Sequence, residues 1–144
     1  MLVSKKEIPL YIPQRWPMIM VDTLLECAEN QYVSQFSPET DNIFNSNGFF
    51  NESGLIENMA QTAALGIGYS TVKSNKEVSL GFIGAIKNLR IYQIPKIENL
   101  LTTKIDVMHK VLNATVIEAN IFIKNELISQ GEFKIFINPL PTEK

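Results

Sequence analysis

The sequence predicts an α+β protein in which a curved antiparallel sheet of about six strands wraps one long central helix. Two observations predict this fold class. One stretch of the chain carries apolar residues at helical spacing with small residues on most sides, and nearly every other apolar stretch reads as a strand bounded by turns. The length of 144 residues is that of one domain, and we expect a single domain over residues 1–144.

The composition excludes several classes of protein. It is ordinary for a globular chain, with 45% hydrophobic and 19% charged residues. The net charge of −2 and the scattered lysines disfavour nucleic acid as a partner, because phosphate binding requires clustered Lys and Arg. One His and one Cys cannot build a zinc site of His and Cys ligands, and we expect no metal or other cofactor.

The sequence also predicts a cytoplasmic protein. Cys27 is the only cysteine, which prevents an intrachain disulfide and favours a reducing compartment. The N-terminus has no apolar run of the kind found in signal peptides. The most apolar stretch contains Glu57, Asn58 and Gln61, which argues against a membrane span.

The chain before the helix reads as a loop, a hairpin and a second loop. Pro13 and Pro17 favour extended backbone. Met18–Cys27, which could begin as a helical turn, and Gln31–Phe36 read as the two strands of the hairpin. Residues 37–53 are rich in Asn, Ser, Asp and Gly, which is typical of a loop. Its large apolar side chains should fold back over an apolar surface, and they are Ile43, Phe44, Phe49 and Phe50.

The helix is predicted from about Gly54 to Val72, with Ser53 as its N-cap. Its periodic residues are Leu55, Ile56, Met59, Ala60, Ala63, Ala64, Ile67 and Thr71. Alanines and glycines lie on several of its faces, so that other backbone can approach nearly all round. We therefore expect a buried central helix.

The rest of the chain, after a polar turn at residues 73–76, reads as strands. We expect these at Val78–Ile86 leading into Leu89–Tyr92, Leu101–Val111, Ala114–Ile123 and Leu127–Ile137. Leu112-Asn113 and Asn125-Glu126 mark tight turns, and short connections join antiparallel neighbours. The expected order is a hairpin, a loop, the helix, and a meander of about four strands that curls around the helix.

Two segments resemble motifs of the 3-hydroxyacyl-(acyl carrier protein) dehydratase family. Ile12–Asp22 is similar to its N-terminal motif, a Pro-His-Arg-x-Pro followed by an apolar run and Val-Asp. Gly54–Ala64 is similar to its central-helix motif, a Gly followed by a Glu and then Ala-Gln, and Pro95–Leu100 resembles its turn between strands. The resemblance covers nearly the whole chain and implies the hot-dog fold. Glu57–Gln61, without a loop histidine, resembles the branch associated with aryl-polyene-type pigment gene clusters.

The resemblance implies removal of water from a 3-hydroxyacyl chain on acyl carrier protein, in fatty-acid or polyene-type biosynthesis. Hot-dog proteins pair into dimers that bind the acyl thioester in tunnels between subunits, and a dimer would also cover the free edge of the sheet. In the family, a loop histidine of one subunit and the helix glutamate of the other move the protons. The glutamate maps onto Glu57. Backbone N–H groups around Ser53 and Gly54, at the helix N-terminus, would bind the oxyanion.

This sequence departs from the family at the histidines. The loop before the helix contains none, and Gln14 replaces the histidine of the N-terminal motif. Asn47 could occupy the space of the loop histidine and donate a hydrogen bond, but an amide cannot act as a base. Phe49 and Phe50 are predicted to line the acyl tunnel. His109, alone in the middle of a strand, is interpreted as structural.

Glu57 is the predicted acid/base, because its neighbours are apolar and Gln61, four residues on, shares its face. Gln61 is a predicted substrate-binding residue of the same site. Glu57 could instead be a carboxylate stabilised by the helix dipole. Arg15 and Asp22 are expected to form a structural pair.

The leading hypothesis is a dehydratase-type lyase. One alternative is a non-catalytic partner subunit of a heteromeric dehydratase. The other is a hot-dog acyl thioesterase in which Glu57 directs water at the thioester. The dimer could be a homodimer or a heterodimer with another hot-dog subunit.

Overall fold

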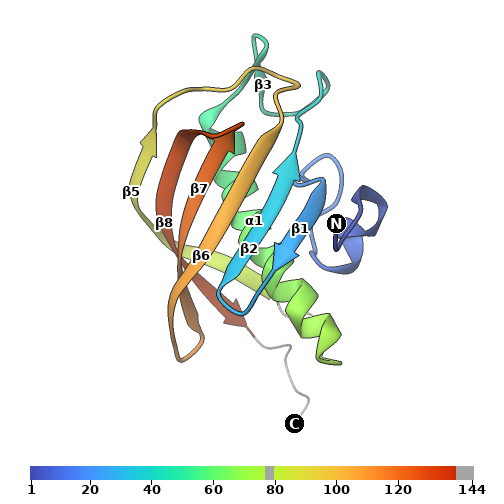
Figure 1. Cartoon of the computed structure of the whole chain (residues 1–144), viewed down its shortest axis with the longest axis vertical. Helices are drawn as coiled ribbons and strands as arrows, with labels where there is room; N and C mark the ends of the chain where they lie inside the picture. Colours follow the sequence, from blue (N-terminus) through green and yellow to red (C-terminus); the bar gives the residue numbers. More distant parts are fainter. Residues whose placement is uncertain (77–79, 139–144) are drawn as a thin grey trace.

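The computed structural model describes residues 1–76 and 80–138 (Figure 1). A six-stranded antiparallel sheet, in the order β1-β2-β6-β7-β8-β5, curves around the helix α1, and a two-stranded hairpin lies outside it. The elements are the 3-10 helix η1 (Lys5–Leu10), β1 (Thr23–Cys27), β2 (Gln31–Phe36), β3 (Asn45–Ser46), β4 (Phe49–Phe50), α1 (Glu52–Lys73), β5 (Leu80–Ile91), β6 (Leu101–Val111), β7 (Ala114–Ile123) and β8 (Glu126–Asn138). The predicted α+β class, with six strands around one long helix, is confirmed.

The predicted bounds are most accurate in the second half of the chain. Those of β6 and β7 match the prediction, and β8 differs by one residue at each end. The turn before β8 lies at Lys124-Asn125, one residue earlier than predicted, with Lys124 at a φ of 56°. The prediction of strand at residues 78 and 79 lies outside the described residues.

The first strand begins later than predicted, at Thr23 and not at Met18. In this segment the backbone groups of Met18 and Met20 bond to side chains of α1, whereas the N–H of Asp22, next to Thr23, donates to the carbonyl oxygen of Gln35 in β2 at 3.0 Å. Met18 O and Met20 N are hydrogen-bonded to Gln61, and Met20 O is hydrogen-bonded to Asn58. This segment therefore covers the helix and does not extend the sheet.

The predicted loop over residues 37–53 contains the hairpin of β3 and β4, which the sequence reasoning missed. Its turn is Asn47-Gly48, with φ values of 54° and 89°, a pair that favours this kind of tight turn. Phe50 folds back into the core as expected, with its ring centroid 5.6 Å from that of Phe36. Phe49 and Ile43 remain exposed, by 42% and 47%, which contradicts the expectation for them.

The helix begins two residues earlier than predicted, and its N-cap is Asn51, not Ser53. The Asn51 side chain accepts a hydrogen bond of 3.1 Å from the N–H of Gly54. Gly54 lies directly beneath the Phe50 ring, because a Cβ there would be 2.4 Å from the nearest ring carbon. Packing of the hairpin on the helix thus fixes where the helix starts.

The predicted four-strand meander is wrong in one connection. β6, β7 and β8 form a meander, but β5 pairs with β8 at the far edge of the sheet and not with β6. Residues 92–100 pass the hairpin on the way, where Phe50 donates to Pro95 O and Ile97 donates to Gly48 O. The two edges of the sheet are therefore β1 and β5.

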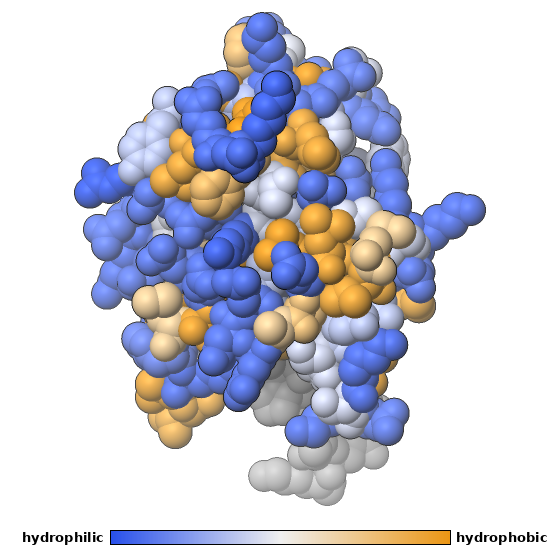
Figure 2. Space-filling view, in the orientation of Figure 1, coloured by the Kyte–Doolittle hydropathy of each residue, from blue (hydrophilic) through white to orange (hydrophobic). Residues whose placement is uncertain are grey.

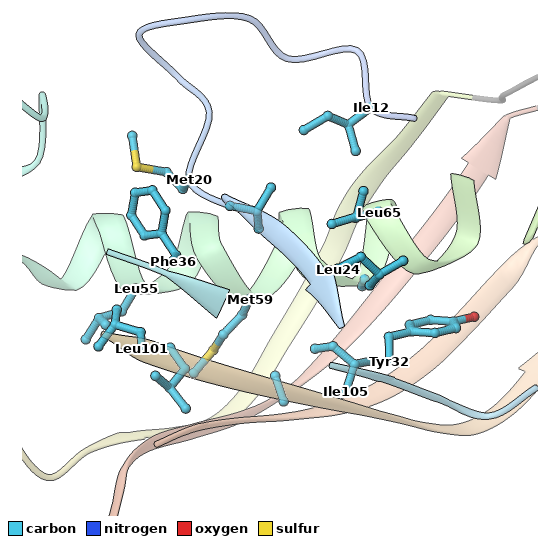
Figure 3. Close-up of a cluster of buried hydrophobic side chains, with 14 of the residues drawn as sticks. Ile12, Met20, Leu24, Tyr32, Phe36, Leu55, Met59, Leu65, Leu101 and Ile105 are labelled. Carbon is cyan, nitrogen blue, oxygen red and sulfur yellow. The ribbon is translucent and has the colours of Figure 1, made fainter. Parts of the chain in front are cut away.

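The core lies between α1 and the concave face of the sheet, where side chains of α1, β2 and β6 interdigitate (Figure 3). On β6, buried Leu101, Thr103 and Ile105 alternate with partly exposed residues. The sheet face in Figure 2 is mainly hydrophilic with apolar areas between, as this alternation requires. One side of α1 is fully buried against the sheet. No helix in the described ranges is long and apolar enough to cross a membrane.

Candidate active site

A pocket of about 220 Å³ lies between the N-terminal segment, α1, and the strands β5 and β8. Its floor is a stripe of α1 residues at three- and four-residue spacing, most of them partly exposed rather than buried as the sequence predicted. The lining residues are Tyr11, Pro13, Gln14, Glu57, Ala60, Ala64, Ile67, Gly68, Thr71, Gly81, Phe82, Ile83 and Ile135. Pockets for drug-sized ligands occupy roughly 300–1,000 Å³, so this pocket is smaller than most of them.

Glu57 is half-buried and lines this pocket, the only carboxylate among the described lining residues. Its Oε2 accepts a hydrogen bond of 2.7 Å from Nε2 of Gln61, one helical turn away. No described residue donates a hydrogen bond to its Oε1. One carboxylate oxygen is therefore held in place and the other remains available to a ligand.

Gln61 joins Glu57 to the N-terminal segment. The fully buried Gln61 side chain accepts from the N–H of Met20 at 2.6 Å and donates to the carbonyl oxygen of Met18 at 2.7 Å. The sequence predicted that Gln61 binds the substrate, but Gln61 is fully buried and is not among the described residues that line the pocket. These hydrogen bonds join the Glu57 carboxylate to the segment that covers the helix.

A buried polar network fixes α1 against the sheet and was not predicted. Asn58 donates to the carbonyl oxygen of Met20 at 2.8 Å and accepts from Thr103 of β6 at 2.5 Å. Thr62 donates to the carbonyl oxygen of Asn58 and is hydrogen-bonded to Ser34 of β2, both at 2.7 Å. Because buried polar groups require partners, this network permits one rotation of the helix about its axis and so aims Glu57 at the pocket. The only sequence signal was an Asn within an apolar helix.

Gln14, which the sequence marked as the replacement for a motif histidine, faces the same pocket as Glu57. Its backbone is braced by Arg15, whose guanidinium donates to the carbonyl oxygens of Ile12 and Gln14 at 2.8 and 2.7 Å. The predicted pair of Arg15 and Asp22 is therefore wrong: Asp22 lies 3.7 Å from the Lys5 ammonium.

The remaining predicted site residues are not among the described residues that line the pocket. Asn47 and Phe49 are exposed in the hairpin, and Phe50 belongs to the core. Ser53 is exposed in the first turn of α1. The N–H of Gly54 already donates to the cap, so it is not a free donor for an oxyanion within this chain.

His109 lies outside this pocket. It is exposed on β6 beside a bulge and lines a separate hollow with Lys87 and Glu132. The Glu57 pocket thus contains no histidine among its described lining residues.

Comparisons with known proteins agree with this architecture. The family model described as ApeP dehydratase matches residues 6–143. The 3-hydroxyacyl-[acyl-carrier-protein] dehydratase FabZ of Rickettsia massiliae is 24% identical to this chain over an alignment of 144 positions, which covers 95% of this chain and 97% of that protein.

Solved structures share the fold. A chain of the dehydratase heterocomplex ApeI:P from Xenorhabdus doucetiae superposes with a TM-score of 0.85 at 16% identity, covering 92% of this chain and 91% of that one. A hypothetical thioesterase with coenzyme A from Streptococcus pneumoniae TIGR4 superposes with a TM-score of 0.64 at 14% identity, covering 81% and 84%. The hot-dog fold and the dehydratase resemblance are confirmed, and this chain belongs to the ApeP-like dehydratase family.

Proposed function

We propose that this protein binds a 3-hydroxyacyl chain, carried as a thioester on acyl carrier protein in the cytoplasm, and removes water from it with Glu57 as the acid/base. One observation carries the proposal: a half-buried carboxylate, held through one oxygen by Gln61, lines a pocket that apolar side chains such as Ala60, Ala64 and Ile67 also line. Membership of a dehydratase family and the relationship to FabZ support the class of reaction.

The reaction requires two proton transfers. The C2–H and C3–O bonds break, and the electron pair left at C2 forms the C2=C3 double bond. The Glu57 carboxylate would take the C2 proton and, as a carboxylic acid, give a proton to the departing C3 hydroxyl, which leaves as water. A positioned acid/base typically contributes a factor of about 10²–10⁴ to the rate.

A second candidate is that the chain is one subunit of a heteromeric dehydratase whose partner supplies the missing histidine. Three observations favour it. The loop before α1 contains no histidine, and the protein with the TM-score of 0.85 is part of a dehydratase heterocomplex. The edge strand β5, which adjoins the pocket, offers a partner sheet an unpaired row of backbone groups.

The test is to incubate the full chain with a 3-hydroxyacyl carrier-protein thioester, alone and together with a co-expressed hot-dog subunit of the same organism. Enoyl product from the chain alone that disappears in Glu57→Gln supports the first function. Product formed only with the second subunit supports the second, and free acid would indicate a thioesterase. Glu52→Gln, an exposed glutamate in the first turn of α1, is the matched control. Full activity of Glu57→Gln in both preparations would refute the site.

A further inference from the structure

Gln14 brings an amide to the pocket that Glu57 lines, and the two ends of this amide differ. Its oxygen, Oε1, is sealed from solvent and has no hydrogen-bond partner among the described residues. Its N–H2 group is not sealed in this way, and it donates no hydrogen bond within the part of the chain that the structure describes. The accessible end of Gln14 is therefore a free hydrogen-bond donor.

The other side-chain donors in the described lining of the pocket are bonded or distant. The Thr71 hydroxyl donates to the carbonyl oxygen of Ile67 at 2.7 Å. The ring centroid of Tyr11 lies 5.5 Å from that of Tyr69, and Tyr69 is about three helical turns beyond Glu57. A donor that serves a ligand at the carboxylate must therefore come from elsewhere in the lining.

The N-terminal segment runs along α1 back toward the N-terminus of the helix. It contacts the helix first at Gly68, where an added Cβ would lie 2.1 Å from the carbonyl oxygen of Tyr11. It contacts the helix again where Gln61 donates to the carbonyl oxygen of Met18. Gln14 lies between these two contacts in the sequence, on the side of the tyrosine from which the segment approaches the carboxylate.

We infer that the N–H2 group of Gln14 donates to the thioester carbonyl oxygen and stabilises the enolate, an inference that rests on the proposed dehydration. When Glu57 takes the C2 proton, the C2–H electron pair forms a C1=C2 bond and the carbonyl π pair moves onto oxygen. When that pair returns, C2=C3 forms and the C3–O bond breaks. The sequence assigned the oxyanion to Ser53 and Gly54, but the first is exposed and the second donates to the cap.

A neutral amide suits this position. It does not titrate, and it forms no ion pair with Glu57 that would weaken the carboxylate as a base. The guanidinium of Arg15 holds the carbonyl oxygens of Ile12 and Gln14 at 2.8 and 2.7 Å, so the donor projects from a braced backbone. Fixed donors stabilise developing charge without reorganisation, and a bond to an oxyanion is stronger than a bond to the neutral carbonyl.

The first measurement is the infrared spectrum of a bound saturated acyl carrier-protein thioester, isotopically labelled at the carbonyl carbon. This ligand has the carbonyl but no C3 hydroxyl, so it cannot be dehydrated. A donated hydrogen bond lowers the stretching frequency of a carbonyl. We expect a lower frequency on the wild-type protein than on Gln14→Met, which keeps the length of the side chain and removes its N–H2 donor.

The second measurement is steady-state dehydration by the same proteins, with the second subunit present if turnover requires it. Removal of one oxyanion donor predicts a fall in kcat of about 10²–10³-fold. KM should change by less than about tenfold, because the neutral carbonyl loses one ordinary hydrogen bond. Gln93→Met, at an exposed glutamine, is the matched control and should change neither the carbonyl frequency nor kcat.

A purely structural role would lower kcat in Gln14→Met and leave the carbonyl frequency unchanged, and that result would overturn the inference. Gln14→Glu is nearly isosteric, cannot donate when ionised, and gives the same test if the methionine variant does not fold. Failure of the wild-type protein to bind and dehydrate the thioester would overturn the proposed function together with the inference. Undiminished kcat in Gln14→Met would overturn the inference alone.

Discussion

Replacing Gln61 by methionine should destabilise the protein and disorient its candidate acid/base at the same time. Methionine has a similar length and shape but cannot hydrogen-bond like an amide. The substitution removes three bonds: from the N–H of Met20, to the carbonyl oxygen of Met18, and to Oε2 of Glu57. The N–H of Met20 is then buried with no acceptor, because Met20 and Gln61 are both fully buried.

The loss in the free energy of unfolding of Gln61→Met follows from these three hydrogen bonds. An unpaired buried N–H costs about 2 kcal/mol, and the other two bonds contribute about 1 kcal/mol each. Burying a thioether in place of an amide returns about 1 kcal/mol. The expected loss is therefore about 3 kcal/mol. For a protein of this size, each kcal/mol lowers Tm by about 2–4 °C, so the midpoint should fall by roughly 6–12 °C.

Thermal and urea unfolding, followed by circular dichroism, measure this loss. Gln93→Met makes the same chemical change at an exposed glutamine and should alter stability by less than about 0.5 kcal/mol. Turnover of Gln61→Met, measured below its melting transition, should also fall because Glu57 loses its orienting bond. If the two variants unfold at the same temperature, the Gln61 amide does not hold the N-terminal segment to the helix.

Three further substitutions test other contacts. Gly68→Ala should lower stability by about 1–3 kcal/mol and weaken acyl binding, because the added Cβ would lie 2.1 Å from the carbonyl oxygen of Tyr11 in the pocket wall. An unchanged Tm and an unchanged affinity would contradict this prediction. Asn51→Ala should cost about 1 kcal/mol in urea unfolding through loss of the cap bond to Gly54, and an unchanged midpoint would refute the cap. Burial raises the pKa of Asp22 above its ordinary value of 3.8, so the stability gained by its protonation is complete below pH 3.8 and lost as pH rises through the raised pKa. Unfolding titrations should therefore show Asp22→Asn gaining stability relative to wild type between pH 3.5 and pH 7, and a constant difference would show that Asp22 does not titrate in this way.

The fold class was predictable from the sequence because local patterns specify it. Alternating burial on β6 and β7 and the helical spacing on α1 are properties of short stretches, and their bounds were predicted closely. Strand neighbours are not local. The pairing of β5 with β8 depends on the path of residues 92–100 past the hairpin, and no residue spacing within β5 indicates it.

In the candidate site, too, local patterns were predictable from the sequence and contacts between distant residues were not. Glu57 could be identified from a motif of the helix, and so could its neighbour Gln61. The bonds of Gln61 to Met18 and Met20 join residues 43 and 41 positions apart, which no sequence pattern reveals. Ser53 and Asn51 are both good N-caps by residue type, and the choice between them depends on how Phe50 packs over Gly54.

The strand order also has a consequence during synthesis on the ribosome. β5 is translated long before its partner β8, because residues 92–125 must follow first, and β2 likewise waits for β6. At about 5–20 residues per second, β5 emerges and then lacks a partner for several seconds. The nascent chain therefore exposes an apolar helix and an unpaired strand, and such surfaces make folding intermediates prone to aggregation. Truncation before β8 should accordingly yield an aggregating chain rather than a weakened domain.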